Sequence, residues 1–193
     1  MPTTFDEIEA LLTELGLRFD VHRGNFRLSF ETQQFRDPAG RHLLTMLIGV
    51  AGEGRHVRLI CPYVLTAGGP HRDALVRACL MVQWSEGLVR FAFDERDGEI
   101  RAAIDVPLED ASLTARQLDH CIRYLAYAVD RYYPALVRAA ADGIIGLAPM
   151  PGAVEIAAQV VVDELTGSGD PADAALAETV RRQLEPPADS GGA

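Results

Sequence analysis

The chain has 193 residues, of which 48% are hydrophobic, and its formal net charge is −10 at pH 7. This is enough apolar material for one main domain with a hydrophobic core and a small appendage. The charge argues against nucleic acid as a partner, because a phosphate-binding surface needs an excess of basic side chains. No segment has the character of a signal peptide or a membrane span, so we expect a cytoplasmic protein with no membrane partner.

The chain is predicted to begin with a helix. Thr4 and Glu7 have the spacing of a capping box, in which each residue bonds the other's backbone N–H. Gly16 stands where a left-handed cap ends a helix. We therefore expect a first helix between these two signals.

A run of antiparallel strands is predicted next. Alternating apolar and polar residues predict a short hairpin over residues 17–30. The nearly continuous apolar run 43–50 is typical of a strand in the middle of a sheet. Residues 56–65 alternate again, and Pro62 predicts an edge or a bulge near the end of that strand, because proline has no N–H to donate.

A second helix and a β-hairpin follow the break at residues 68–70. The helix is expected to end at Gly87 and to bury one side, with these candidates: Leu75, Ala78, Cys79, Val82 and Met81. Residues 88–94 and 100–106 then alternate as two half-buried strands. They are joined through Asp97-Gly98, a pair that tolerates the positive φ of a tight turn.

The longest predicted helix starts at Thr114, with Gln117 as the other half of a second capping box. Its apolar residues recur at steps of three and four and lie on one stripe: Leu118, Ile122, Leu125, Val129, Tyr132 and Leu136. Such a stripe needs a sheet or another helix to cover it. Pro134 lacks an N–H and crowds the preceding turn, so we expect a kink there and fraying soon after.

These elements predict an α+β fold over residues 1–140. It contains an antiparallel sheet of about five to six strands with helices packed on it, in the order α-β-β-β-α-β-β-α. Residues 141–193 carry nine acidic and two basic side chains, so the C-terminal part holds most of the negative charge. We expect an acidic helical extension over 141–185, with helices near 153–165 and 172–184, and a disordered tail over 186–193.

The sequence contains no recognisable catalytic, cofactor-binding or metal-binding pattern. The glycines of residues 49–54 lead into a strand rather than a phosphate-binding helix, and the histidines are scattered. The acidic pairs at 94–95 and 109–110 lie in predicted turns, where carboxylates are ordinarily solvated. Three cysteines with apolar neighbours are expected to be buried free thiols: Cys61, Cys79 and Cys121. We therefore expect a protein that is not an enzyme and needs no cofactor.

Aromatic residues are the candidates for a binding role. Trp84, Tyr132 and Tyr133 are of the type that anchors a bound protein partner, and the alternative is that they pack in the core. The predicted C-terminal helix carries a second candidate, an apolar stripe made of Leu176, Val180 and Leu184. This stripe would bind a partner or cover the domain of its own chain.

Several segments in this order resemble the YbjN domain family of sensory transduction regulators, which is similar in fold to the class I type III secretion chaperones. The segments are Gln83-Trp84-Ser85-Glu86-Gly87-Leu88-Val89-Arg90-Phe91, Asp97-Gly98-Glu99-Ile100, Val106-Pro107-Leu108-Glu109-Asp110, Leu113-Thr114, Gln117-Leu118 and Asp130-Arg131-Tyr132-Tyr133-Pro134-Ala135-Leu136. The resemblance covers about residues 4–138. It departs from the family at Gln83, where asparagine is usual, and the tail from residue 141 has no counterpart.

The resemblance implies a function as well as a fold. Such chaperones are small acidic homodimers that bind an extended segment of a partner across apolar patches, without catalysis. Our leading hypothesis is thus a chaperone-like or regulatory protein-binding module. The alternatives are a self-assembling or autoinhibited module covered by its C-terminal helices, and a small-ligand-binding protein or enzyme that would need a deep pocket with converging histidines and carboxylates.

Overall fold

The structure is a computed structural model that describes residues 3–109, 111–147, 174, 176 and 178. The chain divides into two compact units, Met1–Ala148 and Pro149–Ala193. In the second unit, the described residues Ala174, Leu176 and Glu178 are helical and exposed. The predicted helix at 153–165, most of the one at 172–184 and the predicted tail lie outside the described residues.

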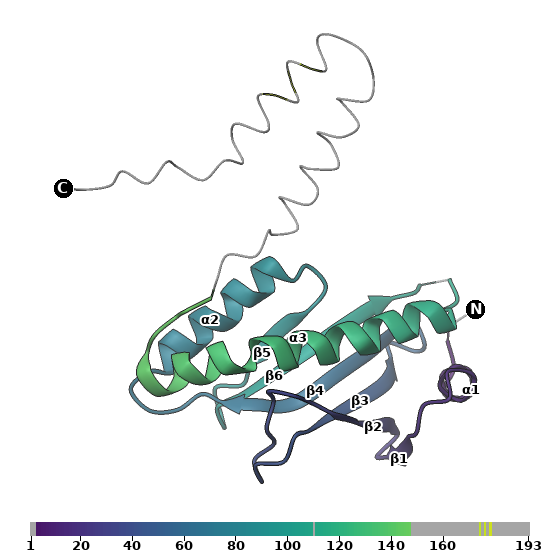
Figure 1. Ribbon diagram of the computed structural model, residues 1–193. Coiled ribbons are helices and arrows are strands. Elements are labelled where there is room, and N and C mark those ends of the chain that lie inside the picture. The colour runs from purple at the N-terminus through teal and green to yellow at the C-terminus, as the bar shows by residue number, and fades with distance from the viewer. Residues whose placement is uncertain (1–2, 110, 148–173, 175, 177, 179–193) are drawn as a thin grey trace, which may run out of the picture. The chain divides into compact units, whose positions relative to one another are not determined.

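The first unit is an antiparallel sheet with helices packed on it, as predicted (Figure 1). The strands are β1 (Asp20–His22), β2 (Asn25–Glu31), β3 (Leu43–Ala51), β4 (His56–Thr66), β5 (Arg90–Phe93) and β6 (Glu99–Pro107), arranged in the order β1-β2-β3-β4-β6-β5. The helices are α1 (Phe5–Glu14), α2 (Arg72–Ser85) and α3 (Ala115–Asp142). The sheet has six strands. Four of them come before α2: the two strands of the predicted hairpin and the two strands that follow it.

Both predicted capping boxes are present. The Thr4 hydroxyl accepts the N–H of Glu7 at 3.2 Å, and the Glu7 carboxylate accepts the N–H of Thr4 at 2.9 Å. Thr114 and Gln117 make the same exchange at the start of α3. These bonds satisfy backbone donors that the first turn of a helix leaves without partners, so they fix where α1 and α3 begin.

The predicted irregularity at Pro62 is a β-bulge. The pairing of β4 with β6 shifts between Cys61 and Leu65, and Tyr63 has a φ of 47°. The buried carboxylate of Glu99, on β6, accepts the N–H of Tyr63 at 3.2 Å. The bulge is thus held by a side chain from the neighbouring strand.

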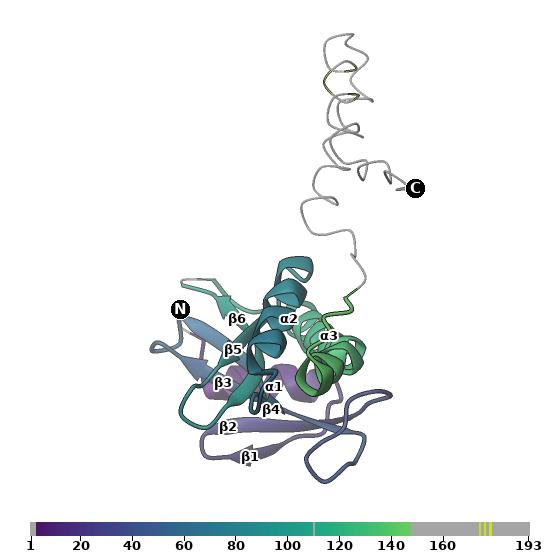
Figure 2. The same ribbon diagram turned by 90° about the vertical axis from the view of Figure 1, so that its left-hand side faces the viewer.

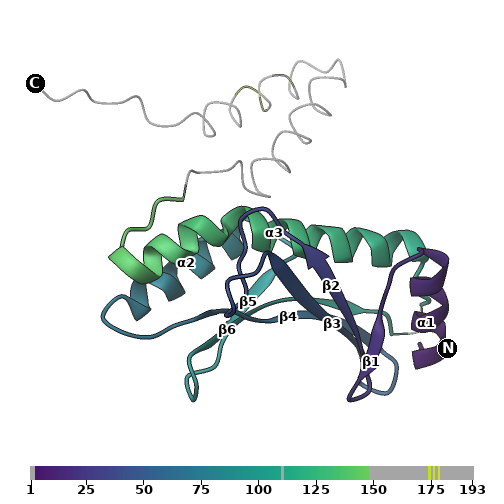
Figure 3. The same ribbon diagram turned by 60° about the horizontal axis from the view of Figure 1, so that its bottom comes forward.

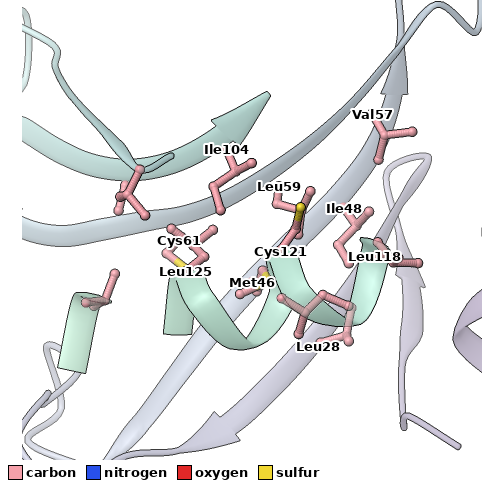
Figure 4. Packing of buried hydrophobic residues seen from close by; sticks show 14 of the residues in the cluster. Leu28, Met46, Ile48, Val57, Leu59, Cys61, Ile104, Leu118, Cys121 and Leu125 are labelled. Atoms are coloured by element: carbon pink, nitrogen blue, oxygen red, sulfur yellow. The ribbon is translucent and has the colours of Figure 1, made fainter. Parts of the chain in front are cut away.

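The main core lies between the sheet and the helices. All six residues of the predicted α3 stripe are buried, which confirms that prediction. Figure 4 shows stripe residues Leu118 and Leu125 facing side chains of the central strands, among them Met46, Ile48 and Leu59. Burial of each such side chain stabilises the fold by about 1.5–3 kcal/mol.

Two details of the helices differ from the prediction. The helix α3 does not fray after Pro134 but runs to Asp142 and ends with Gly143 in a left-handed conformation. It continues because Leu136 and Ala139 are buried in a second hydrophobic cluster with residues of α2. Met81 is 46% exposed, so its predicted place on the buried side of α2 is wrong.

In Figure 2, α3 is seen nearly end-on and α2 lies next to it. The C-terminal end of α2 is tied to strand β5, because the N–H of Phe91 donates to the Gln83 side-chain oxygen at 3.0 Å. Within the described part of the chain, no helix is long and apolar enough to cross a membrane.

Candidate partner-binding surface

The outer side of α2 exposes large apolar side chains. Trp84 is 72% exposed and Leu80, one turn earlier, is 57% exposed. Met81, on α2, and Leu88, three residues after the helix ends, are also exposed, and we call these four residues the α2 ridge. Single exposed apolar residues are ordinary, whereas a group of them close together in sequence is a candidate interaction surface.

A groove of about 660 Å³ begins where the α2 ridge ends. Figures 1 and 3 show that α2 lies alongside the C-terminal half of α3 only, so the first half of α3 has no helix on that flank. The groove is mostly apolar, and its lining includes Leu88 of the ridge, Val106 and Pro107 of β6, and Cys121 of α3. Core side chains can therefore be reached from outside at this point.

A second hollow of about 390 Å³ extends the groove along α3. The two share Arg116 and His120, and the second adds Asp119, Arg123, Tyr124 and Tyr127. Asp119 is bonded to Arg123 at 2.8 Å, and the His120 ring stacks on Tyr124 with centroids 5.7 Å apart. A histidine and carboxylates are thus present, but the carboxylate of Asp119 is engaged by an arginine.

Two of the predicted anchors pack within the domain. Tyr132 is 7% exposed, and its hydroxyl donates to the buried Glu86 carboxylate at 2.8 Å. The hydroxyl of Tyr124 bonds the same carboxylate. Burial, reinforced by Glu86, raises the pKa of Tyr124 and of Tyr132 to about 12. These bonds join the end of α2 to the middle of α3.

Tyr133 is half-buried and holds the loop between β2 and β3. Its ring packs edge-on against Phe35 at 5.0 Å, and its hydroxyl donates to the Arg36 carbonyl oxygen at 3.1 Å. Of the predicted anchors, Trp84 is thus the one that the domain presents to solvent. Leu176 is 52% exposed in the second unit, and Val180 and Leu184 lie outside the described residues.

The sequence did not reveal the role of Asp130. Its carboxylate accepts the N–H groups of Gln33, Gln34 and Phe35 at 2.7–3.1 Å. Burial raises the pKa of Asp130, but the three backbone donors lower it more, so it lies below the ordinary 3.8. No local signal could have shown this, because the partners are 95 to 97 residues away.

All three cysteines are free and buried, as predicted. Burial raises the pKa of each thiol, to about 12 for Cys79, so none is poised as a thiolate nucleophile. No three His, Cys, Asp or Glu side chains among the described residues form a group that could hold a metal ion. The side chains that line the groove and the second hollow can make apolar and ionic contacts with a bound molecule.

Comparison with known proteins identifies a family. The sequence pattern of YbjN, described as "Putative bacterial sensory transduction regulator", matches residues 4–138. A crystal structure of YbjN from E. coli is similar with a TM-score of 0.52 and 11% identity, covering 68% of this chain and 92% of that one. No curated protein matches the chain.

Two solved complexes contain chains that match with lower TM-scores. One is the HopA1-SchA chaperone-effector complex, with a TM-score of 0.44 and 17% identity, covering 65% of this chain and 89% of that chain. The other is the ExsC-ExsE complex, with a TM-score of 0.46 and 14% identity, covering 69% and 96%.

Proposed function

We propose that this chain, which belongs to the YbjN family, is a non-catalytic, chaperone-like or regulatory module that binds a protein partner on the α2 ridge and the adjoining groove. The observation that carries the proposal is the exposure of Trp84, which lies four residues before Leu88 of the groove lining. An indole left in water forgoes stabilisation that burial would supply, and tryptophan is enriched among the residues that dominate binding energy.

Two neighbours of Trp84 in the family-like segment 83–91 have structural partners within the domain. Gln83 bonds the N–H of Phe91, and Glu86 accepts two tyrosine hydroxyls. Trp84 lies between them in sequence yet is turned outward, with 72% of its surface exposed. This supports a role for its side chain outside the domain.

Replacing Trp84 with alanine is expected to weaken partner binding about 30-fold, which corresponds to about 2 kcal/mol, while leaving the fold intact. The measurement is affinity purification from the native host with quantitative mass spectrometry, followed by titration of the recovered partner against both proteins. The thermal unfolding midpoint should hardly change, because exposed side chains contribute little to stability.

Val21→Ala is the matched control, because Val21 is also exposed and apolar but lies on β1, at the other edge of the sheet. It should retain the partner as the wild type does. Recovery of the same proteins by Trp84→Ala and the wild type would contradict the proposed site, and a wild-type chain that retained no protein would contradict the function.

We also propose that the protein is a homodimer, as its resemblance to the class I chaperones implies. One chain has a mass of 21.0 kDa, so sedimentation equilibrium should give twice that value. A single species at the mass of one chain, over the micromolar range, would show that the protein is a monomer.

A further inference from the structure

The chain stays on the domain after α3 ends. Residues 144–147, which we call the strap, run from the end of α3 beside α2 (Figures 1 and 2). Along the strap, Ile145 and Leu147 are half-buried, whereas Ile144 and Gly146 are exposed. Every second residue thus faces the domain, as in an extended chain.

The strap covers apolar surface that α2 and α3 share. Ile145 and Leu147 pack against the second hydrophobic cluster, which includes Leu75 and Val82 of α2 and Leu136 of α3. We call this covered surface the α2–α3 seam. It accepts a short extended segment that carries aliphatic side chains at alternate positions, and in this structure that segment belongs to the chain itself.

Side-chain contacts alone hold the strap in place. The N–H of Gly143, just before the strap, donates to the Ala139 carbonyl oxygen at 3.2 Å. Among the residues that the structure describes, none forms a hydrogen bond with residues 144–147. A segment with few buried contacts and no hydrogen bonds opens at a lower free-energy cost than a packed helix. The strap can therefore leave the seam while α2 and α3 stay folded.

The seam and the α2 ridge lie on the same helix. Val82 belongs to the cluster under the strap, whereas Leu80 and Trp84 are exposed. An α-helix with its side chains is about 10–12 Å across, so a partner on the ridge lies within reach of the seam. The strap would compete with such a partner, because its attachment to α3 gives it an effective concentration of roughly millimolar at the seam.

We propose that the strap is an autoinhibitory segment, and that an extended segment of the partner, with aliphatic side chains at alternate positions, replaces it on the α2–α3 seam. This inference rests on the proposed function. It adds a second contact for the partner and a means by which the chain regulates its own binding.

The test pans a random peptide-display library on the full-length Ile145→Ser variant, in which the strap has lost an apolar contact. The recovered peptides should carry Ile, Leu or Val at alternate positions. They should bind the wild type about tenfold more weakly, because a site that is open about a tenth of the time binds with about a tenth of its intrinsic affinity. Leu147→Ser is the second variant and should bind them as tightly as Ile145→Ser.

Ile144→Ser is the matched control, because it makes the same substitution one position away at an exposed side chain. It should bind the peptides as weakly as the wild type. Circular dichroism of each variant establishes that it is folded. A strap with only a structural role would lower the stability of Ile145→Ser without raising its affinity for any peptide.

The outcomes separate this inference from the proposed function. Peptides that bound Ile145→Ser and the wild type equally, or that bound Ile144→Ser as tightly as Ile145→Ser, would overturn the inference. The function would still stand if the wild type retained a native partner through Trp84. If the wild type retained no partner, both would fail. A native partner that bound Ile145→Ser about tenfold more tightly than the wild type would support both.

Discussion

Replacing Asp130 with alanine is expected to lower the free energy of unfolding by about 3 kcal/mol, because three backbone N–H groups lose a charged acceptor. The donors belong to Gln33, Gln34 and Phe35, in the loop between β2 and β3. Without the carboxylate, these three N–H groups would have to bond to water or to other acceptors. Urea unfolding followed by circular dichroism measures the change.

The control lies on the same helix. Asp119→Ala removes a carboxylate that pairs with Arg123 on the surface, four residues away, and such pairs contribute about 0.5 kcal/mol or less. Equal losses from the two substitutions would show that the backbone bonds of Asp130 do not stabilise the loop.

The effect of Asp130→Ala should depend on pH in a defined direction. The pKa of Asp130 is lower in the folded chain than its ordinary value of 3.8. A group with a depressed pKa stabilises the fold above its unfolded-state pKa, and that contribution is lost as the pH falls through the folded-state pKa. The difference between wild type and variant should therefore be full at neutral pH and shrink only below about pH 3.8. A difference that shrank near neutral pH would contradict this assignment.

Glu86→Ala is expected to cost about 2 to 3 kcal/mol of stability. The substitution leaves the buried hydroxyl of Tyr132 without its acceptor and removes the link between the end of α2 and α3. It also deletes packed side-chain volume, which adds the cost of a cavity. Thermal and urea unfolding would report the loss, and near-ultraviolet circular dichroism would report changed packing of Tyr124 and Tyr132.

Glu86→Gln is the matched variant, because it keeps the side-chain volume and one carbonyl oxygen. It should retain most of the stability, with a loss of about 1 kcal/mol, since a neutral acceptor forms weaker hydrogen bonds than a carboxylate. A loss as large as that of alanine would mean that the negative charge, rather than the hydrogen bonds, holds the two helices together.

The fold could be predicted wherever the signals are local. A capping box spans four residues, and the apolar residues of the α3 stripe recur every three or four residues. The signals at Thr4, Thr114 and Leu118 can therefore be recognised from residues within one or two helical turns. Strand alternation and the bulge at Pro62 are signals of the same kind. These local signals agree with one another, which is why the α+β order was predicted in outline.

The candidate binding surface was less predictable, because α2 is apolar around much of its circumference. The pattern alone could not decide whether Met81 or Cys79 faces the core, and packing against α3 turned Met81 outward. The same rotation exposes Trp84. Likewise, Pro134 predicted that α3 would fray soon after it, because proline disrupts the preceding turn. Burial of Leu136 and Ala139 against α2 outweighs this effect, and the helix continues.

The hydrogen bond from Phe91 to Gln83 also bears on how the protein avoids aggregation. β5 is an outer strand of the sheet, and outer strands offer N–H groups to which the strand of another molecule can pair. The Gln83 side chain occupies one of these donors, and β1 at the other edge is only three residues long. Fibril-like growth of the sheet would first have to break the Gln83 bond on one side and find little backbone to extend on the other.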